Sequence, residues 1–329
     1  MTRLHQILIG LLAAQLILVG LVFFLPQPGR AAATPLLGDT KAEDITTLTI
    51  QDDRGVRIKL AKAAAGWVLP EADDFPADDA KITPVTVKLA ALKAGRSVAQ
   101  NEANFKRLQV ADDTYQRKIE ISTAAGASYT LYLGSSAGGR ATHVRLAGQR
   151  DVYIASDLAP FDVNADAASW INTMYLEASS ADAVALTLKN ANGEFIFEKN
   201  AQREWTMQGV RADEVFSTNN FSTVLTYASS VRMTKPLGKT DHPAYGMAQP
   251  SAVVTLKTKK DDQEKTITLT IGARDAQDST YIVKSSESPY YVKVNDYSVS
   301  ELVTRGRANF ILQPTPTPGP TATPTPRAP

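Results

Sequence analysis

The sequence predicts an α+β protein: two tandem copies of a β-rich domain, each a hairpin, a helix and an antiparallel meander, following an N-terminal transmembrane helix. Three observations lead to this prediction. Matching residues recur at one spacing in the two halves, each half contains alternating apolar residues of strand type, and a 19-residue apolar run lies near the start. The chain of 329 residues is long enough for two domains with cores of their own.

The internal repeat is the strongest signal. Trp67 and Trp205 lie 138 positions apart, and so do Gly134 and Gly272. A spacing that stays constant over most of the chain indicates two copies of one unit with few net insertions. The predicted organisation starts with a membrane anchor or uncleaved signal at 1–30 and a linker at 31–44. The first repeat covers 45–171, a linker covers 172–182 and the second repeat covers 183–312. A disordered Pro/Thr-rich tail follows at 313–329.

Each repeat opens with three predicted strands. Val56, Ile58 and Leu60 alternate on one face after a turn at Gly55, and Asn192-Gly193 suits the type I′ turn of a hairpin. A third short strand then carries the tryptophan of each repeat.

A helix follows in each repeat. In the first, Thr83 is the expected cap, with Pro84 in the first turn and Gly95 after the end. In the second, the apolar stripe is Phe221, Val224, Leu225, Ala228 and Val231.

A four-stranded meander completes each repeat, and a short helical stretch near Trp170 or Glu301 closes it. The predicted meander strands are 115–122, 128–133, 142–146 and 152–155, then 252–258, 266–271, 280–284 and 290–294.

These motifs resemble the domain-of-unknown-function 4340 family. The second repeat carries Glu204-Trp205, Tyr245-Gly246-Met247 and Ile271-Gly272, and the first departs at the corner, where Arg107-Leu108 stand in place of Tyr-Gly. The resemblance covers most of 45–311. It implies a membrane-anchored bacterial envelope protein, sometimes encoded beside ABC-transporter components, and it implies no catalytic residues.

Six residues are predicted to have structural roles, and no catalytic, cofactor-binding or metal-binding residues are predicted. The tryptophans suit core packing, with a sugar-stacking platform as the alternative, and the arginines suit acid pairing or helix capping, with ligand binding as the alternative. These residues are Trp67, Trp205, Gly134, Gly272, Arg96 and Arg232.

Catalytic and metal signals are weak. Gly134-Ser135-Ser136-Ala137-Gly138 fits the G-x-S-x-G pattern with His143 nearby, but a hydrolase elbow needs a helix after the turn, and a glycine-rich hairpin loop is expected instead. Five acidic residues could bind calcium, although their spacing misses the EF-hand pattern and favours a solvated loop. They are Glu71, Asp73, Asp74, Asp78 and Asp79.

The ends of the chain point to the cell envelope. Residues 7–25 are long enough for a membrane span, and Ala31 and Ala33 also suit a signal cleavage site, so a retained anchor and a secreted product both stay open. The tail 313–329 is expected to be extended and polyproline-like, either without a function or as a spacer.

The sequence therefore predicts a single-pass membrane protein with most of the chain on the extracytoplasmic side. Its expected function is that of a non-enzymatic scaffold or auxiliary subunit of a membrane complex, with other envelope or membrane proteins as partners. A glycan- or small-ligand-binding module is the alternative, and a serine hydrolase through Ser136 is a remote one. No cofactor is expected, and the balance of 35 Lys+Arg against 34 Asp+Glu argues against nucleic acid.

Overall fold

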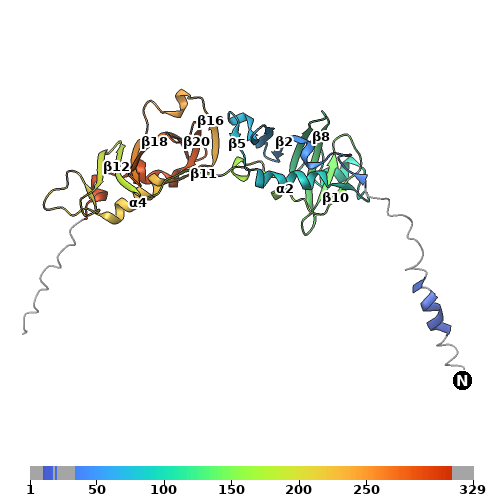
Figure 1. The fold of residues 1–329 in the computed structure, drawn as a ribbon. Helices are drawn as coiled ribbons and strands as arrows, with labels where there is room; N and C mark the ends of the chain where they lie inside the picture. Colours follow the sequence, from blue (N-terminus) through green and yellow to red (C-terminus); the bar gives the residue numbers. More distant parts are fainter. Residues whose placement is uncertain (1–9, 18, 21–33, 313–329) are drawn as a thin grey trace, which may run out of the picture. The chain divides into compact units, whose positions relative to one another are not determined.

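The computed structural model describes residues 10–17, 19–20 and 34–312, which form two compact units (Figure 1). The first unit takes in residues up to Ile58 together with Ile82–Ala165, and the second takes in Lys59–Lys81 and the chain from Asp166 onward. The structure holds two eight-stranded antiparallel sheets and a few short helices. The prediction of β-rich domains with few helices is therefore confirmed.

The first sheet is built on apolar alternation. Leu48 faces Ile121 and Ile50 faces Ile119 across paired strands, and all four side chains are buried. Cross-strand pairs of this kind fix the register, because a one-residue slip would turn the apolar side chains to the opposite face. The strand order is β10 (Tyr153–Ala155), β9 (Ala141–Leu146), β8 (Ser128–Gly138), β7 (Arg117–Thr123), β2 (Ile45–Asp52), β3 (Arg57–Ala63), β4 (Gly66–Leu69) and β5 (Phe75–Pro76).

The second sheet follows the same logic. Leu186 pairs with Leu256 and Leu188 with Val254, and all four side chains are buried. The strand order is β14 (Trp205–Met207), β13 (Gly193–Lys199), β12 (Ala183–Asn190), β17 (Ala252–Lys260), β18 (Gln263–Asp275), β19 (Thr280–Ser285), β20 (Tyr291–Asn295) and β16 (Lys235–Gly238).

Smaller elements complete the structure. Two short antiparallel pairs are formed by β1 (Thr34–Pro35) with β6 (Lys93–Ala94) and by β11 (Met174–Glu177) with β15 (Ser230–Arg232). The helices are α2 (Asp79–Ala90), α3 (Glu102–Arg107), α4 (Thr218–Ser229) and α5 (Ser300–Thr304). The single-turn 3-10 helices are η1 (Ala42–Asp44), η2 (Pro70–Ala72), η3 (Pro160–Asp162), η4 (Ala167–Ser169), η5 (Pro243–Tyr245), η6 (Asp296–Ser298) and η7 (Arg307–Phe310).

The predicted meander strands match β7 to β10 and β17 to β20, and the predicted closing turns are η4 and α5. The start of the first helix was predicted wrongly. It begins at Asp79 instead of after Thr83, with Pro84 inside it, because the carboxylate of Asp78 already accepts the N–H of Ala80 and starts the helix there. Two other residues lie outside the elements predicted for them. Val231 lies in β15 after the helix, and Val56 precedes β3 and is 45% exposed.

The predicted membrane segment at 7–25 is described only at 10–17 and 19–20, which are helical. Across the described residues, the structure contains no helix with both the length and the apolar character needed to cross a bilayer. The predicted tail at 313–329 lies outside the described residues.

Candidate functional site

The hairpin of β17 and β18 carries a dense cluster of charged side chains in the second unit. Its strands meet at Asp261 and Asp262, both in the left-handed region with φ of 48° and 64°, as a two-residue type I′ turn requires. Six of the seven residues from Lys259 to Lys265 are charged, and all seven are exposed. Because β12 pairs with β17 only as far as Thr258, the tip of the hairpin extends past its neighbour in the sheet.

A hollow of about 600 Å³ lies between this hairpin and β11. Leu176 and Ile267, both buried, are among its apolar residues, while its charged side chains carry both signs. Lys265 forms an ion pair with Glu287 across it. The full lining is Tyr175, Leu176, Glu177, Ala178, Ser179, Asp182, Thr258, Lys260, Asp261, Gln263, Lys265, Ile267 and Glu287. We call this hollow the hairpin groove.

A second hollow, of about 520 Å³, is also lined in part by the hairpin tip. Asp261 lines both hollows. The second one also includes Lys199, whose ammonium group lies 5.3 Å from the ring centre of Trp205. Its remaining residues are Val184, Asn200, Arg203, Lys259 and Asp262. The hairpin tip therefore contributes charged side chains to two hollows.

The wall of the hairpin groove is held by backbone and side-chain contacts. In β11, Tyr175 donates its hydroxyl to the carbonyl of Tyr290 at 2.7 Å and accepts the N–H of Ser285 at 2.8 Å. Burial raises the pKa of the Tyr175 phenol, so it stays neutral and can serve as both donor and acceptor. These contacts fix β11 as a stable wall. The arrangement can bind a ligand through ion pairs and hydrogen bonds over a small apolar floor.

The predicted tryptophans differ in burial. Trp67 is 7% exposed in β4, and its backbone N–H donates to the Asp79 carboxylate at 2.9 Å. Trp205 is half-buried, and its ring centre lies 4.6 Å from that of Phe221 on α4. Its other neighbour is the ammonium group of Lys199.

The predicted glycines accept a close backbone approach. A Cβ at Gly134 would lie 2.0 Å from the carbonyl oxygen of Leu108, and one at Gly272 would lie 2.1 Å from that of Tyr245. The residue after each carbonyl is in the left-handed region, Gln109 with φ 56° and Gly246 with φ 69°. The corner of the first unit is therefore Leu108-Gln109, one residue later than the predicted Arg107-Leu108.

The predicted arginines are both exposed. Arg96 follows β6. Arg232 lies in β15, where its guanidinium donates to the hydroxyl of Thr173 at 3.4 Å.

Ser136 lies inside β8, whose last residue is Gly138, so the expected hairpin loop is strand here and the turn falls at Gly139 and Arg140. The Ser136 hydroxyl accepts the N–H of Gly138 at 3.2 Å. His143 instead contacts Ser135, with 3.2 Å between Nδ1 and the hydroxyl.

The acidic residues after β4 act separately. Asp73 accepts the backbone N–H of Lys239 at 2.6 Å, and Asp78 and Asp79 accept the backbone N–H groups of Ala80 and Trp67. In the described residues, no group of three or more His, Asp or Glu side chains is arranged to hold a metal ion.

The sequence prediction missed the hairpin groove. The charge density from Lys259 to Lys265 could have drawn attention to the hairpin tip, but an exposed turn has the same composition. The wall opposite comes from residues 175–182, which are far away in the sequence.

The fold and the groove together define the class of protein: a β-rich protein whose second unit carries a charged surface groove. A family model described as a domain of unknown function, DUF4340, matches residues 67–232, just over half of the chain. The chain therefore belongs to the DUF4340 family. The match begins at Trp67 and ends at Arg232, so Tyr245, Gly246 and Met247 lie beyond it. No curated protein and no solved structure matches the chain.

Proposed function

We propose that the protein is a membrane-tethered, non-enzymatic scaffold of the bacterial cell envelope that docks a polypeptide subunit of a membrane complex. The observation that carries this proposal is the hairpin groove, whose lining combines Lys260 and Lys265, the acids Glu177, Asp182 and Asp261, and the buried apolar side chains of Leu176 and Ile267. Interfaces commonly combine an apolar centre with a polar, solvent-accessible rim. The resemblance noted above suggests ABC-transporter-like complexes as the class of partner.

The charge pattern supports a macromolecular partner. Both signs occur within one groove, so a docked segment with the matching pattern gains attraction while a mismatched one meets like charges. At physiological salt, the attraction between exposed charges is largely screened once they are more than about 8–10 Å apart, and more salt shortens this distance. The complex should therefore weaken as salt is raised.

The proposed tether is the apolar segment 7–25, with the bulk of the chain on the extracytoplasmic side. Its support is its length and lack of charge. Cell fractionation and sequencing of the mature N-terminus test it. A chain retained in membranes after carbonate washing agrees with the tether, whereas a soluble chain starting at Ala32 or Thr34 would favour cleavage and secretion.

We also propose that the two sheets arose from duplication of one unit. Seven strands follow one order in both sheets, from β10 to β4 in the first and from β20 to β14 in the second. The close approaches at Gly134 and Gly272 are alike as well. An extra edge strand distinguishes each sheet, β5 in one and β16 in the other.

Charge reversal tests the docking surface. The full chain is purified in mild detergent from native membranes as wild type and as the double variant Lys260→Glu/Lys265→Glu. The control is Lys41→Glu/Lys93→Glu, which reverses two exposed lysines of the first unit. We expect one membrane protein to co-purify with the wild type and the control but not with the groove variant. Equal recovery with all three chains would reject the groove as the docking surface.

A further inference from the structure

Tyr297 presents an open aromatic ring in the second unit. Its side chain is 70% exposed, the highest value for a large hydrophobic side chain in the described part of the chain. It lies in η6, between the last strand of the sheet and α5, and its hydroxyl accepts a hydrogen bond from the side-chain amide of Asn295 at 3.2 Å. Among the described residues, no cation or second ring covers this ring.

The ring borders a shallow hollow of about 470 Å³. Every other residue of its lining carries a hydroxyl, amide or carboxylate group: Asp278, Ser279, Asn295, Asp296 and Ser300. A single aromatic face surrounded by short polar side chains matches a ligand that has both an apolar face and many hydroxyl groups.

Neighbouring cations hold the two carboxylates of the hollow in place. Asp296 accepts two hydrogen bonds from the guanidinium of Arg274, at 2.9 and 3.1 Å. Asp278 accepts one from the ammonium of Lys293 at 2.6 Å and one from the hydroxyl of Thr280 at 2.5 Å. The hydrogen bond from Lys293 is the main reason why the pKa of Asp278 lies below its usual value. Asp278 is therefore an ionised, positioned acceptor at neutral pH, and Asp296 is positioned by its two hydrogen bonds from Arg274.

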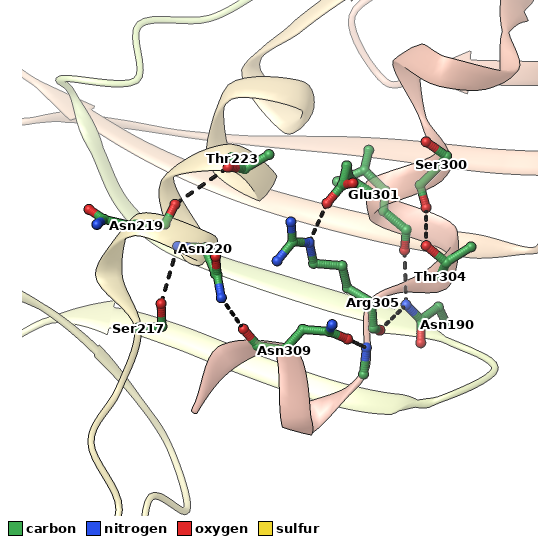
Figure 2. A network of polar contacts seen from close by, with 12 residues as sticks. Asn190, Ser217, Asn219, Asn220, Thr223, Ser300, Glu301, Thr304, Arg305 and Asn309 are labelled. Carbon is green, nitrogen blue, oxygen red and sulfur yellow. Dashed lines mark hydrogen bonds and ion pairs between the residues drawn. The ribbon is translucent and has the colours of Figure 1, made fainter. Parts of the chain in front are cut away.

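Helix α5, which begins at Ser300 in the lining of the hollow, is fixed to the body of the unit, as Figure 2 shows. The side-chain amide of Asn190 donates to the carbonyls of Leu302 and Arg305, both at 2.9 Å. The hydroxyl of Thr304 donates to the carbonyl of Ser300 at 2.7 Å, and Arg305 pairs with Glu301. A site on such a base needs little ordering when a ligand binds.

We propose that the hollow at Tyr297 is a carbohydrate-binding site. One sugar ring stacks its apolar C–H face on Tyr297, and its hydroxyl groups donate to Asp278 and Asp296 and exchange hydrogen bonds with Asn295, Ser279 and Ser300. In the envelope proposed above, a glycan of the cell wall would be the ligand within reach. The inference goes beyond the proposed docking function and uses different residues.

The first unit also has an exposed aromatic ring beside carboxylates, but a cation already lies over that ring. Phe161 is 65% exposed, but the guanidinium of Arg140 lies over it, 4.9 Å from the ring centre. Arg140 also pairs with Asp162 at 2.8 Å and with Asp157 at 3.0 Å. The covered face cannot stack on a sugar without losing the cation–π contact. Of these two exposed rings, Tyr297 is therefore the one open for binding, and Phe161 is a matched control.

Saccharide titrations test the site. The full chain is purified in lauryldimethylamine oxide, which has no sugar head group, and titrated by calorimetry with the β-1,4-linked tetramers of N-acetylglucosamine and of glucose. Binding to purified peptidoglycan is measured by co-sedimentation. We expect the wild type to bind at least one of the three, Tyr297→Ala to bind it about tenfold or more weakly, and Tyr297→Trp and Phe161→Ala to bind it within about threefold of the wild type.

Two outcomes would overturn the proposal: no binding of any of the three saccharides by the wild type, or undiminished binding by Tyr297→Ala. A melting temperature equal to that of the wild type shows that the alanine variant is folded. Lys260→Glu/Lys265→Glu should bind the saccharide normally, and Tyr297→Ala should retain the co-purifying membrane protein. These variants therefore test the carbohydrate site and the docking groove independently of each other.

Discussion

The carbonyl oxygen of Leu108 occupies the space that a Cβ atom on Gly134 would need, at 2.0 Å. Tyr245 and Gly272 stand in the same relation in the second unit, at 2.1 Å. Glycine at these positions therefore allows the corner of each unit to lie against its central hairpin.

Alanine at Gly134 or Gly272 should destabilise the chain. The added methyl group must displace backbone, and overpacking of this kind costs about 1–3 kcal/mol or more. Thermal unfolding of the full chain measures the effect, with Gly95→Ala as the control, because a Cβ there meets no atom within 4 Å. A Gly134→Ala chain that unfolds at the control temperature would contradict the close approach.

The two tryptophans should differ in their contribution to stability. Trp67 is almost fully buried, so Trp67→Ala should lower the unfolding free energy by about 3–5 kcal/mol. Trp205 is half-buried against Phe221, and Trp205→Ala should cost less, about 1–3 kcal/mol. Urea denaturation of both variants gives the comparison. A larger loss of unfolding free energy for Trp205→Ala than for Trp67→Ala would contradict the burial of the two rings described above.

Asp52 should make stability depend on acidity. Burial acts to raise the pKa of its carboxyl, but hydrogen bonds from the Arg54 side chain and from the N–H groups of Val56 and Arg54 outweigh it, so the pKa lies below its usual value. The unfolded chain therefore binds this proton more readily than the folded one. The resulting stabilisation is complete above about pH 4 and is lost as the pH falls through the native pKa.

Asp52→Asn tests this contribution. At pH 7 the variant should be less stable than the wild type by about 1–2 kcal/mol, because the hydrogen bonds to the carboxylate lose their charge. The loss is no larger because Arg54 is exposed to solvent, where ion pairs contribute little. The difference should shrink as the pH falls below about 4. Asp53→Asn, at an exposed neighbour, is the control. A difference that stays constant from pH 7 to pH 2 would contradict the assignment.

Ser136 should not be a nucleophile. It lies in a strand, and the hydroxyl in contact with His143 belongs to Ser135. A fluorophosphonate probe should leave the full chain unlabelled, and Ser136→Ala should change stability by less than about 0.5 kcal/mol. Labelling that Ser136→Ala abolishes would restore the hydrolase alternative.

Local patterns were sufficient to predict most of the sheets. The alternation in β12, β17 and β18 and the stripe on α4 predicted strands and helix, because their buried side chains follow the period of each element. The short edge strands β5, β11 and β16 were not predicted. They contain two to four residues, too few for a clear alternation. β11 and β16 are held by pairing with strands distant in sequence, whereas β5 pairs with the preceding strand β4.

The candidate sites depend even more on distant contacts. Asp278 and Lys293 are separated by a strand and a turn, and their ion pair forms only when β19 and β20 pair. The exposure of Tyr297 likewise depends on how η6 leaves the sheet. An Asp-Tyr-Ser sequence between a strand and a helix predicts a turn but gives no sign of an open ring.

Photo-crosslinking at the hairpin tests the docking function most directly. A benzoylphenylalanine replaces Lys260 in the full chain, or Lys41 as the control, and native cells are irradiated before the adducts are identified by mass spectrometry. We expect an adduct with one membrane protein from position 260 and none from position 41. The absence of an adduct at 260, in a chain that is present in the membrane fraction, or an equal yield of the same adduct at 41, would contradict the docking function.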